Sequence, residues 1–285
     1  MFDTVTLGSS DWPSQLNEIP HPPERLYLRG QLPPPELTLL AVVGSRAYSS
    51  YGKRVVRHLI EGLRGQPVGI VSGLALGIDA LAHEAALAAD LYTLAVFGTG
   101  LDESVWYPAK NRPLAHRILQ SGGGLLSEYP PDTPAAKWTF PERNRLVVGL
   151  CQATLLVEAA EQSGTLITAR LTADYNRELG VVPGDIFSKT SRGVHQFLKL
   201  GATPITEPAD LIELLGLEAT DTLRSPARTL SPEAAAVVAL LSEPLPRDAL
   251  IRALGQPTAQ AATLLTRLEL EGIIANDSGT YRALV

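Results

Sequence analysis

The sequence predicts an α/β fold: a doubly wound, mostly parallel sheet followed by a small C-terminal domain of helices and a hairpin. Two observations predict the sheet. Short apolar runs recur along most of the chain, and stretches of helix-compatible composition separate them. Runs that are apolar on both faces suit strands covered by helices on both sides of a sheet. This pattern is typical of a Rossmann-like domain, which binds ligands beyond the carboxyl ends of its strands.

Residues 1–38 are rich in proline, which fixes φ and removes a backbone donor, so a regular helix is not expected there. We expect an extended lead-in that is strapped to the surface of the following domain by Trp12, Leu16, Leu26 and Tyr27.

Residues 39–215 carry the alternating pattern. The expected strands are Leu39–Val43, Val68–Val71, Leu91–Val96, Gly124–Leu126, Ala153–Val157, Val181–Val182 and Thr203–Ile205. The expected helices are Tyr51–Leu63, Ile78–Ala88, Asn111–Leu119, Thr165–Glu178 and Val194–Leu200. Helical crossovers make neighbouring strands parallel and bring the loops that follow them to one edge of the sheet.

The pattern breaks near residue 215. We expect residues 216–230 to form a linker and residues 231–285 to form a separate domain. Ser231-Pro232-Glu233 has the form of a helix start, with a hydroxyl cap, a proline in the first turn and an early acid. Expected helices at Arg247–Leu254 and Thr258–Glu271 and a hairpin after Ile273 complete a winged-helix-like domain.

Composition limits the class of protein. No apolar run reaches the length of about 18 residues that spans a membrane, and the N-terminus does not resemble a secretion signal. A single cysteine, Cys151, excludes an internal disulfide framework, so we expect a cytoplasmic protein in which this thiol is buried and inert. The histidines are scattered without ligand spacing, so no metal is expected.

The net charge of −6 excludes a protein that coats DNA with a basic surface. Any nucleic-acid site must be a local basic pocket within an acidic body.

Loops after the expected strands carry groups suited to an anion. Gly44-Ser45-Arg46 combines a tight turn, a hydroxyl and a guanidinium beside a helix start, although a plain turn with a surface arginine explains it equally well. Gly73 lets the backbone approach a ligand or a helix. Ser163-Gly164-Thr165 and Ser191 lie at helix starts, where free amides bind anions and where capping alone also explains the hydroxyls. Together these loops predict a shared pocket rich in backbone amides.

Two titratable residues follow Gly73. Asp79 lies in the first turn of the expected helix, where a negative charge opposes the helix dipole, and packing with dipole compensation explains it better than catalysis. His83, on the same helix, is expected to be packed or solvated rather than a general base.

The densest group of cations and aromatic residues spans residues 137–145. Cations there can meet phosphates, and an aromatic ring gives a base a stacking surface that contributes about 1–3 kcal/mol. The candidate contacts are Lys137, Phe140, Arg143, Asn144 and Arg145. In the alternative reading, Trp138 and Phe140 anchor the core and the arginines pair with acids such as Glu128 and Glu142.

Cofactor and nucleophile motifs are incomplete. Gly98-Thr99-Gly100 is half of a dinucleotide fingerprint, without the third glycine or the acidic partner. Gly52-Lys53-Arg54 lacks the glycine spacing and the hydroxyl of an ATP phosphate loop. No GxSxG nucleophile motif is present. We therefore expect no cofactor, no metal and no catalytic residue.

Taken together, ordered motifs over roughly residues 12–215 resemble the DNA-processing protein A family, also called Smf. The motifs are VVGSR at Val42–Arg46, SGLALGIDALAH at Ser72–His83, GTGLDESVWYPAKN at Gly98–Asn111, GGGLLSEYP at Gly122–Pro130, FPERNR at Phe140–Arg145, SGTLITAR at Ser163–Arg170 and VPG at Val182–Gly184.

The resemblance implies a dimerising Rossmann-like domain that binds single-stranded DNA. It also implies that the protein protects incoming DNA and loads a RecA-type recombinase on it during natural transformation and recombination. The residues carried over to the DNA pocket are Arg46, Lys137, Phe140, Arg143 and Arg145, with Ser163, Gly164 and Ser191 as secondary phosphate contacts. The chain departs from the family at His195, where asparagine is more usual, and in having only a short lead-in where many relatives carry a helical domain.

Two other hypotheses remain. The first is a nucleotide-binding or nucleoside-monophosphate-cleaving Rossmann-like enzyme that uses Ser163-Gly164-Thr165 with Glu158. The second makes the C-terminal domain a reader of duplex DNA. Its candidate recognition helix, Thr258–Glu271, offers Arg267 as its only cation, so a partner-contact or architectural role fits this domain at least as well.

Overall fold

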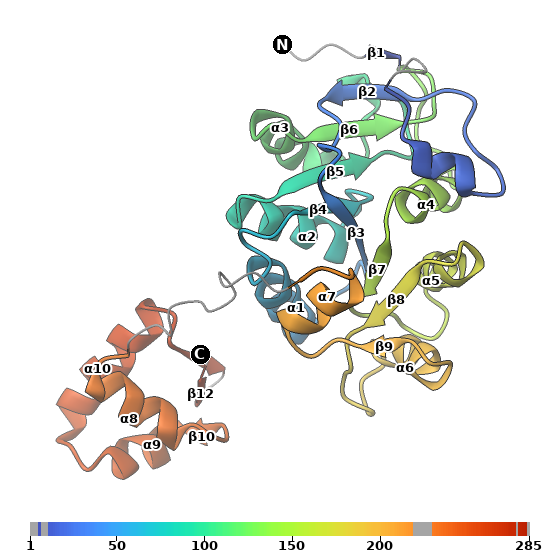
Figure 1. The fold of residues 1–285 in the computed structure, drawn as a ribbon. Helices are drawn as coiled ribbons and strands as arrows, with labels where there is room; N and C mark the ends of the chain where they lie inside the picture. The colour runs from blue at the N-terminus through green and yellow to red at the C-terminus, as the bar shows by residue number, and fades with distance from the viewer. Residues whose placement is uncertain (1–4, 7–10, 219–229, 278, 284–285) are drawn as a thin grey trace. The chain divides into compact units, whose positions relative to one another are not determined.

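A computed structural model of the chain describes residues 5–6, 11–218, 230–277 and 279–283. The chain divides into two compact units, residues 1–223 and residues 224–285, each with its own core (Figure 1). The expected linker at residues 216–230 falls mostly on residues 219–229, which lie outside the described residues. None of the described helices is long and apolar enough to cross a membrane.

The large unit is built on a nine-stranded sheet with the order β1-β2-β6-β5-β4-β3-β7-β8-β9 over the described residues. The strands are β1 (Val5–Thr6), β2 (Tyr27–Gly30), β3 (Thr38–Val43), β4 (Val68–Ser72), β5 (Tyr92–Val96), β6 (Gly124–Ser127), β7 (Ala153–Leu156), β8 (Glu178–Val181) and β9 (Thr203–Pro204). In the part of the sheet ordered β6-β5-β4-β3-β7-β8-β9, all neighbouring strands are parallel. β2 is antiparallel to both of its neighbours, β6 and β1. The predicted doubly wound, mostly parallel α/β fold is confirmed.

Helices cover both faces of this sheet. They are α1 (Ser50–Glu61), α2 (Ile78–Ala88), α3 (Arg112–Gln120), α4 (Thr139–Gly149), α5 (Thr165–Asp174), α6 (Arg192–Lys199) and α7 (Pro208–Leu214). Alternate residues of a strand point to opposite faces, and β3 shows this directly. Leu39 and Ala41 pack in the core that holds α4, α5 and α6, while Leu40 and Val42 pack in the core that holds α1, α2 and α7.

The lead-in is more deeply integrated than expected. Leu16 and Leu26 are fully buried in the core rather than fastened to the surface, and Tyr27 is buried too. Tyr27–Gly30 forms β2, which adds an antiparallel strand to the sheet, and Ser14–Glu18 forms a short 3₁₀ helix. The sequence did not predict this strand, because the four residues of β2 lie between two proline-rich stretches where no regular element was expected.

Several predicted element boundaries are wrong. The helix expected at Thr165–Glu178 ends at Asp174, because Asn176 adopts a φ of 52° and turns the chain into β8. Residues 139–149 were not expected to be helical, yet they form α4. Pro141 lies in its first turn, where a missing N–H removes no intrahelical hydrogen bond.

The small unit contains the predicted helices and hairpin. Its elements are α8 (Pro232–Leu240), β10 (Leu245–Pro246), α9 (Arg247–Leu254), α10 (Thr258–Leu270), β11 (Ile274–Asp277) and β12 (Thr280–Ala283). The Ser231 hydroxyl accepts a hydrogen bond from the Ala234 amide at 3.2 Å, as the cap motif predicted. β12 pairs with β10 and β11, and Leu250, Leu265 and Tyr281 lie in the core between the sheet and the helices. The winged-helix prediction is confirmed.

His83 is packed in the large unit, as expected. Its ring lies fully buried, with Nδ1 2.7 Å from the Thr93 hydroxyl. That hydroxyl donates to the Ile70 carbonyl oxygen at 2.9 Å, so it accepts from His83 Nδ1–H. Burial, with a smaller contribution from the charge of Arg143, lowers the pKa of His83 to about 3. The imidazole is therefore neutral in the folded protein at neutral pH.

We predict that His83 makes the free energy of unfolding depend on pH between 7 and 5. The unfolded chain protonates this imidazole below its ordinary pKa of 6.5, whereas the folded protein does so only near pH 3. The stabilising contribution is therefore complete above pH 6.5 and is lost as the pH falls towards 3. Urea titrations at pH 7 and pH 5 measure the free energy of unfolding. Its decrease between these pH values should be about 2 kcal/mol smaller for His83→Gln than for the wild type.

The matched control is His58→Gln, which changes an exposed histidine of α1. Its loss of stability between the two pH values should equal that of the wild type. Equal losses in His83→Gln and the wild type would contradict the prediction.

Candidate functional site

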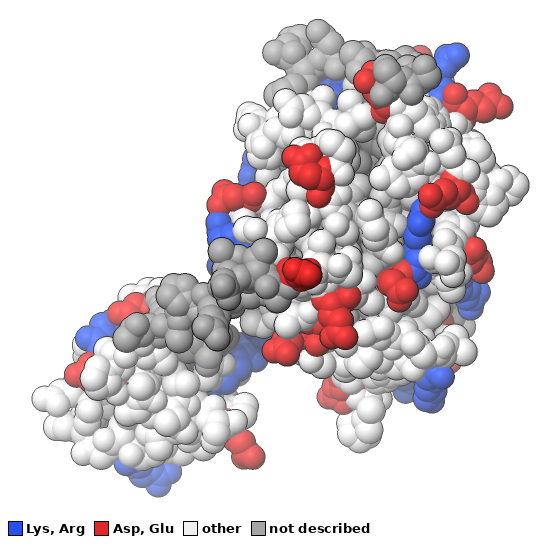
Figure 2. Space-filling model, in the orientation of Figure 1, with Lys and Arg blue, Asp and Glu red and all other residues white. Residues whose placement is uncertain are grey.

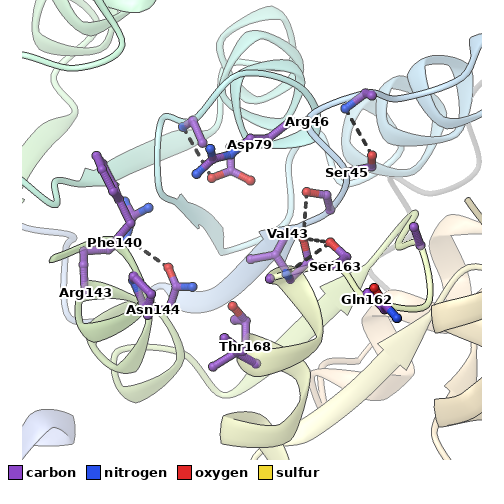
Figure 3. A pocket seen from close by; sticks show the side chains of 18 of the residues that line it. Val43, Ser45, Arg46, Asp79, Phe140, Arg143, Asn144, Gln162, Ser163 and Thr168 are labelled. Atoms are coloured by element: carbon purple, nitrogen blue, oxygen red, sulfur yellow. Dashed lines mark hydrogen bonds between the residues drawn. The ribbon is translucent and has the colours of Figure 1, made fainter. Parts of the chain in front are cut away.

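A cavity of about 720 Å³ lies at the carboxyl ends of the central strands. The strand order reverses between β3 and β7, and in such sheets this switch point leaves a crevice for ligands. The segments after β3, β4, β5, β6 and β7 contribute to the lining together with α4. The lining residues are Val43, Gly44, Ser45, Arg46, Ala47, Ala75, Asp79, Tyr107, Lys137, Phe140, Pro141, Arg143, Asn144, Ala160, Gln162, Ser163, Gly164, Thr165, Ile167 and Thr168. In Figure 3, the residues of α4 lie on one side of Val43 and Gln162 on the other.

The loop after β3 depends on a glycine. A Cβ on Gly44 would lie 2.6 Å from Cγ1 of Ile78, at the start of α2, so a side chain has no room there. Ser45 Oγ accepts a hydrogen bond from the Ala47 amide at 3.1 Å and shapes the turn. Arg46 is exposed on the cavity rim.

The helix after this loop, α1, begins at Ser50, and its first turn does not line the cavity. Ser49 caps that helix, and its hydroxyl accepts from the Gly52 amide at 3.1 Å. The described geometry therefore leaves Arg46, rather than the amides of α1, as the group that this loop offers to an anion.

The start of α5 does open on the cavity. Ser163 Oγ accepts from the Thr165 amide at 3.2 Å, and the Thr165 hydroxyl donates to the Gly44 carbonyl oxygen at 3.1 Å. This second hydrogen bond joins the loop after β3 to the loop after β7. The first turn of a ten-residue helix, with its partial positive charge, thus forms one wall of the cavity.

Arg143 is the structural centre of the opposite wall. Its side chain comes from α4, and the residue is only 4% exposed. Nη1 donates to the carbonyl oxygen of Gly73, at 2.7 Å, and to that of Val96. Nε donates to Oδ1 of Asn144 at 3.1 Å. Burial lowers the pKa of Arg143 to about 10, so the group remains charged at neutral pH.

Gly73 makes room for this guanidinium. A Cβ at position 73 would lie 2.1 Å from Nη2 of Arg143. The main role of this glycine is thus to admit Arg143, although it also borders a small hollow next to the cavity.

Asp79 lies close to the same group. Its carboxylate accepts hydrogen bonds from the amides of Gly73 and Ala75, at 3.2 and 3.4 Å. Burial raises the pKa of Asp79, and the charges of Arg143 and Arg46 act in the opposite direction. The position in the first turn of α2 agrees with dipole compensation, and the hydrogen bonds add a second structural role.

Lys137 and Phe140 are more accessible to solvent than Arg143 and Asp79. Lys137 is exposed, and Phe140 is half-buried against Gly98, where a Cβ would lie 2.9 Å from Cδ1 of the ring. The centroids of the Phe140 and Tyr107 rings are 5.5 Å apart. Trp138 is exposed and contacts Tyr129 edge-on, so it is not a core anchor.

Two of the candidate contacts lie away from the cavity. Arg145 pairs with Glu128, as the alternative interpretation proposed, and does not line the cavity. Arg143 and Arg145 are two positions apart on a helix, which points them to different faces. Ser191 is buried, and its Oγ occupies the space beside Gly184.

Several residues of the lining are not among those that the sequence predicted. Tyr107 is exposed beside Phe140, and Gln162, Ile167 and Thr168 belong to the loop after β7 and to α5. Tyr107 follows the third predicted strand, so its position at the carboxyl edge of the sheet was an available signal. Gln162 follows the predicted strand Ala153–Val157 and Ile167 lies in the expected helix after it, so the same signal was available for these residues.

The enzyme hypothesis required Glu158 as a reactive group. The structure buries this residue, and its carboxylate accepts hydrogen bonds from the Ser49 amide, the Ser49 hydroxyl and the Thr190 hydroxyl, at 2.8, 2.6 and 3.1 Å. It does not line the cavity. Glu158 therefore joins the start of α1 to the loop before α6. Among the described residues, no group of His, Cys, Asp and Glu could hold a metal ion.

Comparison with known proteins identifies the family. Residues 3–216 match the DNA recombination-mediator protein A family. The chain belongs to this family. Residues 218–280 match the DprA winged helix domain.

Relatives in this family are similar along much of their length. The chain is 39% identical to protein Smf of Escherichia coli K12 over 286 residues, covering 97% of this chain and 76% of the relative. It is also 39% identical to DNA processing protein DprA of Streptococcus pneumoniae, over 74% of this chain and 73% of the relative.

Solved structures of the family have the same fold. The crystal structure of Streptococcus pneumoniae DprA matches with a TM-score of 0.69 at 37% identity, covering 77% of this chain and 75% of that one. A structure of DNA processing protein A from Helicobacter pylori, which describes its single-stranded DNA binding mode, matches with a TM-score of 0.66 at 31% identity. That match covers 75% of this chain and 96% of the Helicobacter chain.

We predict that Arg143→Ala destabilises the large unit by about 2–4 kcal/mol. The variant leaves the carbonyl oxygens of Gly73 and Val96 without their donor, and each buried group of this kind costs about 1–3 kcal/mol. Urea unfolding at neutral pH measures the change. Arg46→Ala is the control, because an exposed arginine on the rim should change the stability by about 0.5 kcal/mol or less. Equal stabilities of the two variants would contradict the structural role of Arg143.

Proposed function

We propose that the large unit binds single-stranded DNA in the cavity at the carboxyl ends of β3 and β7. The observation that supports this most directly is the combination on its rim of two exposed cations, Arg46 and Lys137, with the half-buried ring of Phe140. Single-strand sites combine groups for the phosphates with aromatic surfaces for the bases. The single-stranded DNA binding of the Helicobacter relative supports the same assignment.

The two cations are available for phosphate. Neither Arg46 nor Lys137 has a described carboxylate oxygen within 4.0 Å, whereas Arg29, Arg145 and Arg177 are all paired with acids. The start of α5 adds partial positive charge from the opposite wall. A phosphate chain can therefore bind locally in spite of the net charge of −6.

The acidic side chains on one face of the large unit restrict where DNA can bind (Figure 2). On the face of the large unit shown in Figure 2, acidic side chains are spread across the middle, and most Lys and Arg side chains lie nearer the edges. Such a surface repels a nucleic-acid backbone. We therefore propose a defined pocket rather than a broad basic surface.

Stacking on Phe140 gives the site its preference for single strands. The ring is packed against Gly98 and contacts Tyr107, so it is held in place before a base arrives. A duplex keeps its bases stacked on one another and cannot offer a free base face without melting. The arrangement thus favours unpaired DNA through the bases and tolerates any sequence.

We further propose that the protein acts without catalysis or a cofactor, as a homodimer in the cytoplasm that protects incoming DNA and loads a RecA-type recombinase on it. The recombination-mediator description of the family supports the loading step. Recombinase assembly on DNA covered by a single-strand binding protein tests it. An unchanged assembly rate in the presence of this protein would contradict the loading proposal, and a monomeric mass in solution would contradict the dimer.

We propose that the small unit contributes little to DNA binding. Arg267, the cation of α10, is 2.7 Å from a carboxylate oxygen of Glu233 and 3.8 Å from one of Glu271. These pairs occupy the group that would contact the backbone of a duplex. We propose a partner-contact or architectural role for this unit.

We predict that Arg46→Ala and Lys137→Ala each weaken binding of a single-stranded oligonucleotide and reduce its dependence on salt. Loss of one phosphate contact should lower the slope of log affinity against log salt by about 0.7, because one fewer counterion is released. Fluorescence anisotropy over a series of salt concentrations measures both effects. Arg117→Ala, which removes an exposed cation of α3 outside the cavity lining, is the matched control. Wild-type slopes in both rim variants would contradict the assignment of the pocket.

We predict a different signature for Phe140→Ala. Affinity should fall by about tenfold, within the range of about 1–3 kcal/mol expected for one stacked base. The salt slope should stay at the wild-type value, since stacking releases no counterions. Phe140→Trp should retain most of the affinity, and a loss equal to that of Phe140→Ala would show that the ring does not stack with a base.

A further inference from the structure

The loop between β8 and α6, residues 183–191, exposes an apolar pair that no role assigned above uses. Phe187 is 86% exposed and Ile186 is 72% exposed. The loop is drawn in yellow in Figure 1, between the ends of β8 and α6. Single exposed apolar residues are common on protein surfaces, but two adjacent large ones on a loop at the ligand-binding edge of a sheet require a reason.

The main chain of the loop is held firmly at its tip. The Phe187 amide donates to a carboxylate oxygen of Asp185 at 2.8 Å, and the Ser188 amide donates to the Asp185 carbonyl oxygen at 3.0 Å. The Thr190 amide then donates to Ser188 Oγ at 3.3 Å. The two apolar side chains therefore point into solvent from an ordered turn, and their exposure is a property of the fold.

Both ends of the loop are joined to the segments that form the cavity. At its start, the Tyr51 hydroxyl of α1 donates to the Pro183 carbonyl oxygen at 2.7 Å. At its end, the Ala159 amide donates to the Thr190 carbonyl oxygen at 2.8 Å. Ala160, the next residue, lines the cavity. Since Phe187 is three residues from Thr190, its Cα lies within about 11 Å of the Thr190 Cα.

Cations accompany the aromatic ring. Lys189 and Arg192 are exposed, and neither has a carboxylate oxygen within 4.0 Å among the described residues. The one acid of the loop, Asp185, has its carboxylate engaged by the Phe187 amide. The loop and the start of α6 thus resemble the cavity rim in composition, with an exposed aromatic ring followed in the chain by two cations that are available for phosphates.

We propose that this loop is a second contact region for single-stranded DNA, in which a base stacks on Phe187 while Lys189 and Arg192 bind the adjoining phosphates. The inference rests on the proposed binding of single-stranded DNA in the cavity, and it extends that site past Ala160 along the edge of the sheet. Ile186 widens the apolar surface beside the ring. A strand long enough to leave the cavity reaches the loop, and a short one does not.

The two cations that follow the exposed ring in the chain favour DNA over a protein partner. A contact between proteins buries apolar groups and usually excludes charges from its centre, whereas a nucleic-acid contact requires both. Lys189 and Arg192 lie two and five residues from Phe187 in the chain, so a protein that covered the ring would also have to bury or pair these charges.

The test compares the affinity of the full chain for oligothymidylates of about 4 and about 16 nucleotides, the range of common single-strand sites. Phe187→Ala should weaken binding of the long oligonucleotide by about tenfold and leave the short one unchanged. Phe187→Trp should restore the affinity for the long oligonucleotide. Lys189→Ala should weaken binding of the long oligonucleotide alone and reduce its salt slope by about 0.7. Leu270→Ala removes an equally exposed apolar side chain, 84% exposed, from the small unit and is the matched control.

The outcomes separate this inference from the proposed function. If the wild type binds neither oligonucleotide, the proposed function itself fails. If the wild type binds both oligonucleotides and Phe187→Ala binds each of them as tightly as the wild type does, only the second contact region is overturned. A change in the mass of Phe187→Ala in solution, with unchanged affinity for the long oligonucleotide, would assign the loop to a protein contact instead.

Discussion

The guanidinium of Arg143 lies inside the large unit and donates hydrogen bonds to main-chain carbonyl oxygens after β4 and at the end of β5. A buried cation is stable only when its hydrogen-bonding capacity is used, so these bonds fix the distance between α4 and the sheet. Gly73 is part of the same constraint, because any side chain there would overlap the guanidinium. The position of α4, and with it that of Lys137 and Phe140, depends on this one buried group.

The cations of residues 137–145, in α4 and just before it, differ in their surroundings. Arg143 is buried and holds the wall, and Arg145 is paired with Glu128. Lys137 remains exposed at the rim. A segment that is basic in sequence therefore offers few free charges to a ligand. The net charge stays at −6, and the phosphate contacts that we propose are the cations without an acidic partner among the described residues.

The loops at the carboxyl edge of the sheet are joined by hydrogen bonds that run between distant parts of the chain. Thr165 binds the carbonyl oxygen of Gly44, and Glu158 accepts from Ser49 and Thr190. These bonds use the hydroxyls and the carboxylate for structure. They also make one continuous edge from the loop after β3 to the loop before α6, so this surface is already formed before any ligand binds.

The alternation of apolar runs with helical stretches was enough to predict the doubly wound sheet, since strands buried on both faces need covering helices. It also predicted that the loops with Gly44 and Ser163 would meet, because parallel strands bring their carboxyl ends to one edge. The cap at Ser231 was equally local and equally predictable. By itself, the sequence thus determined the fold class, and it predicted the edge of the sheet where the cavity lies and half of the residues that line it. Only the tertiary structure decided that β2 joins the sheet and that Arg143 is buried while Arg145 pairs with Glu128. It also decided that the carboxylate of Glu158 accepts hydrogen bonds from Ser49 and Thr190. These outcomes depend on partners up to 109 residues away in the chain, and local composition carries no record of such partners.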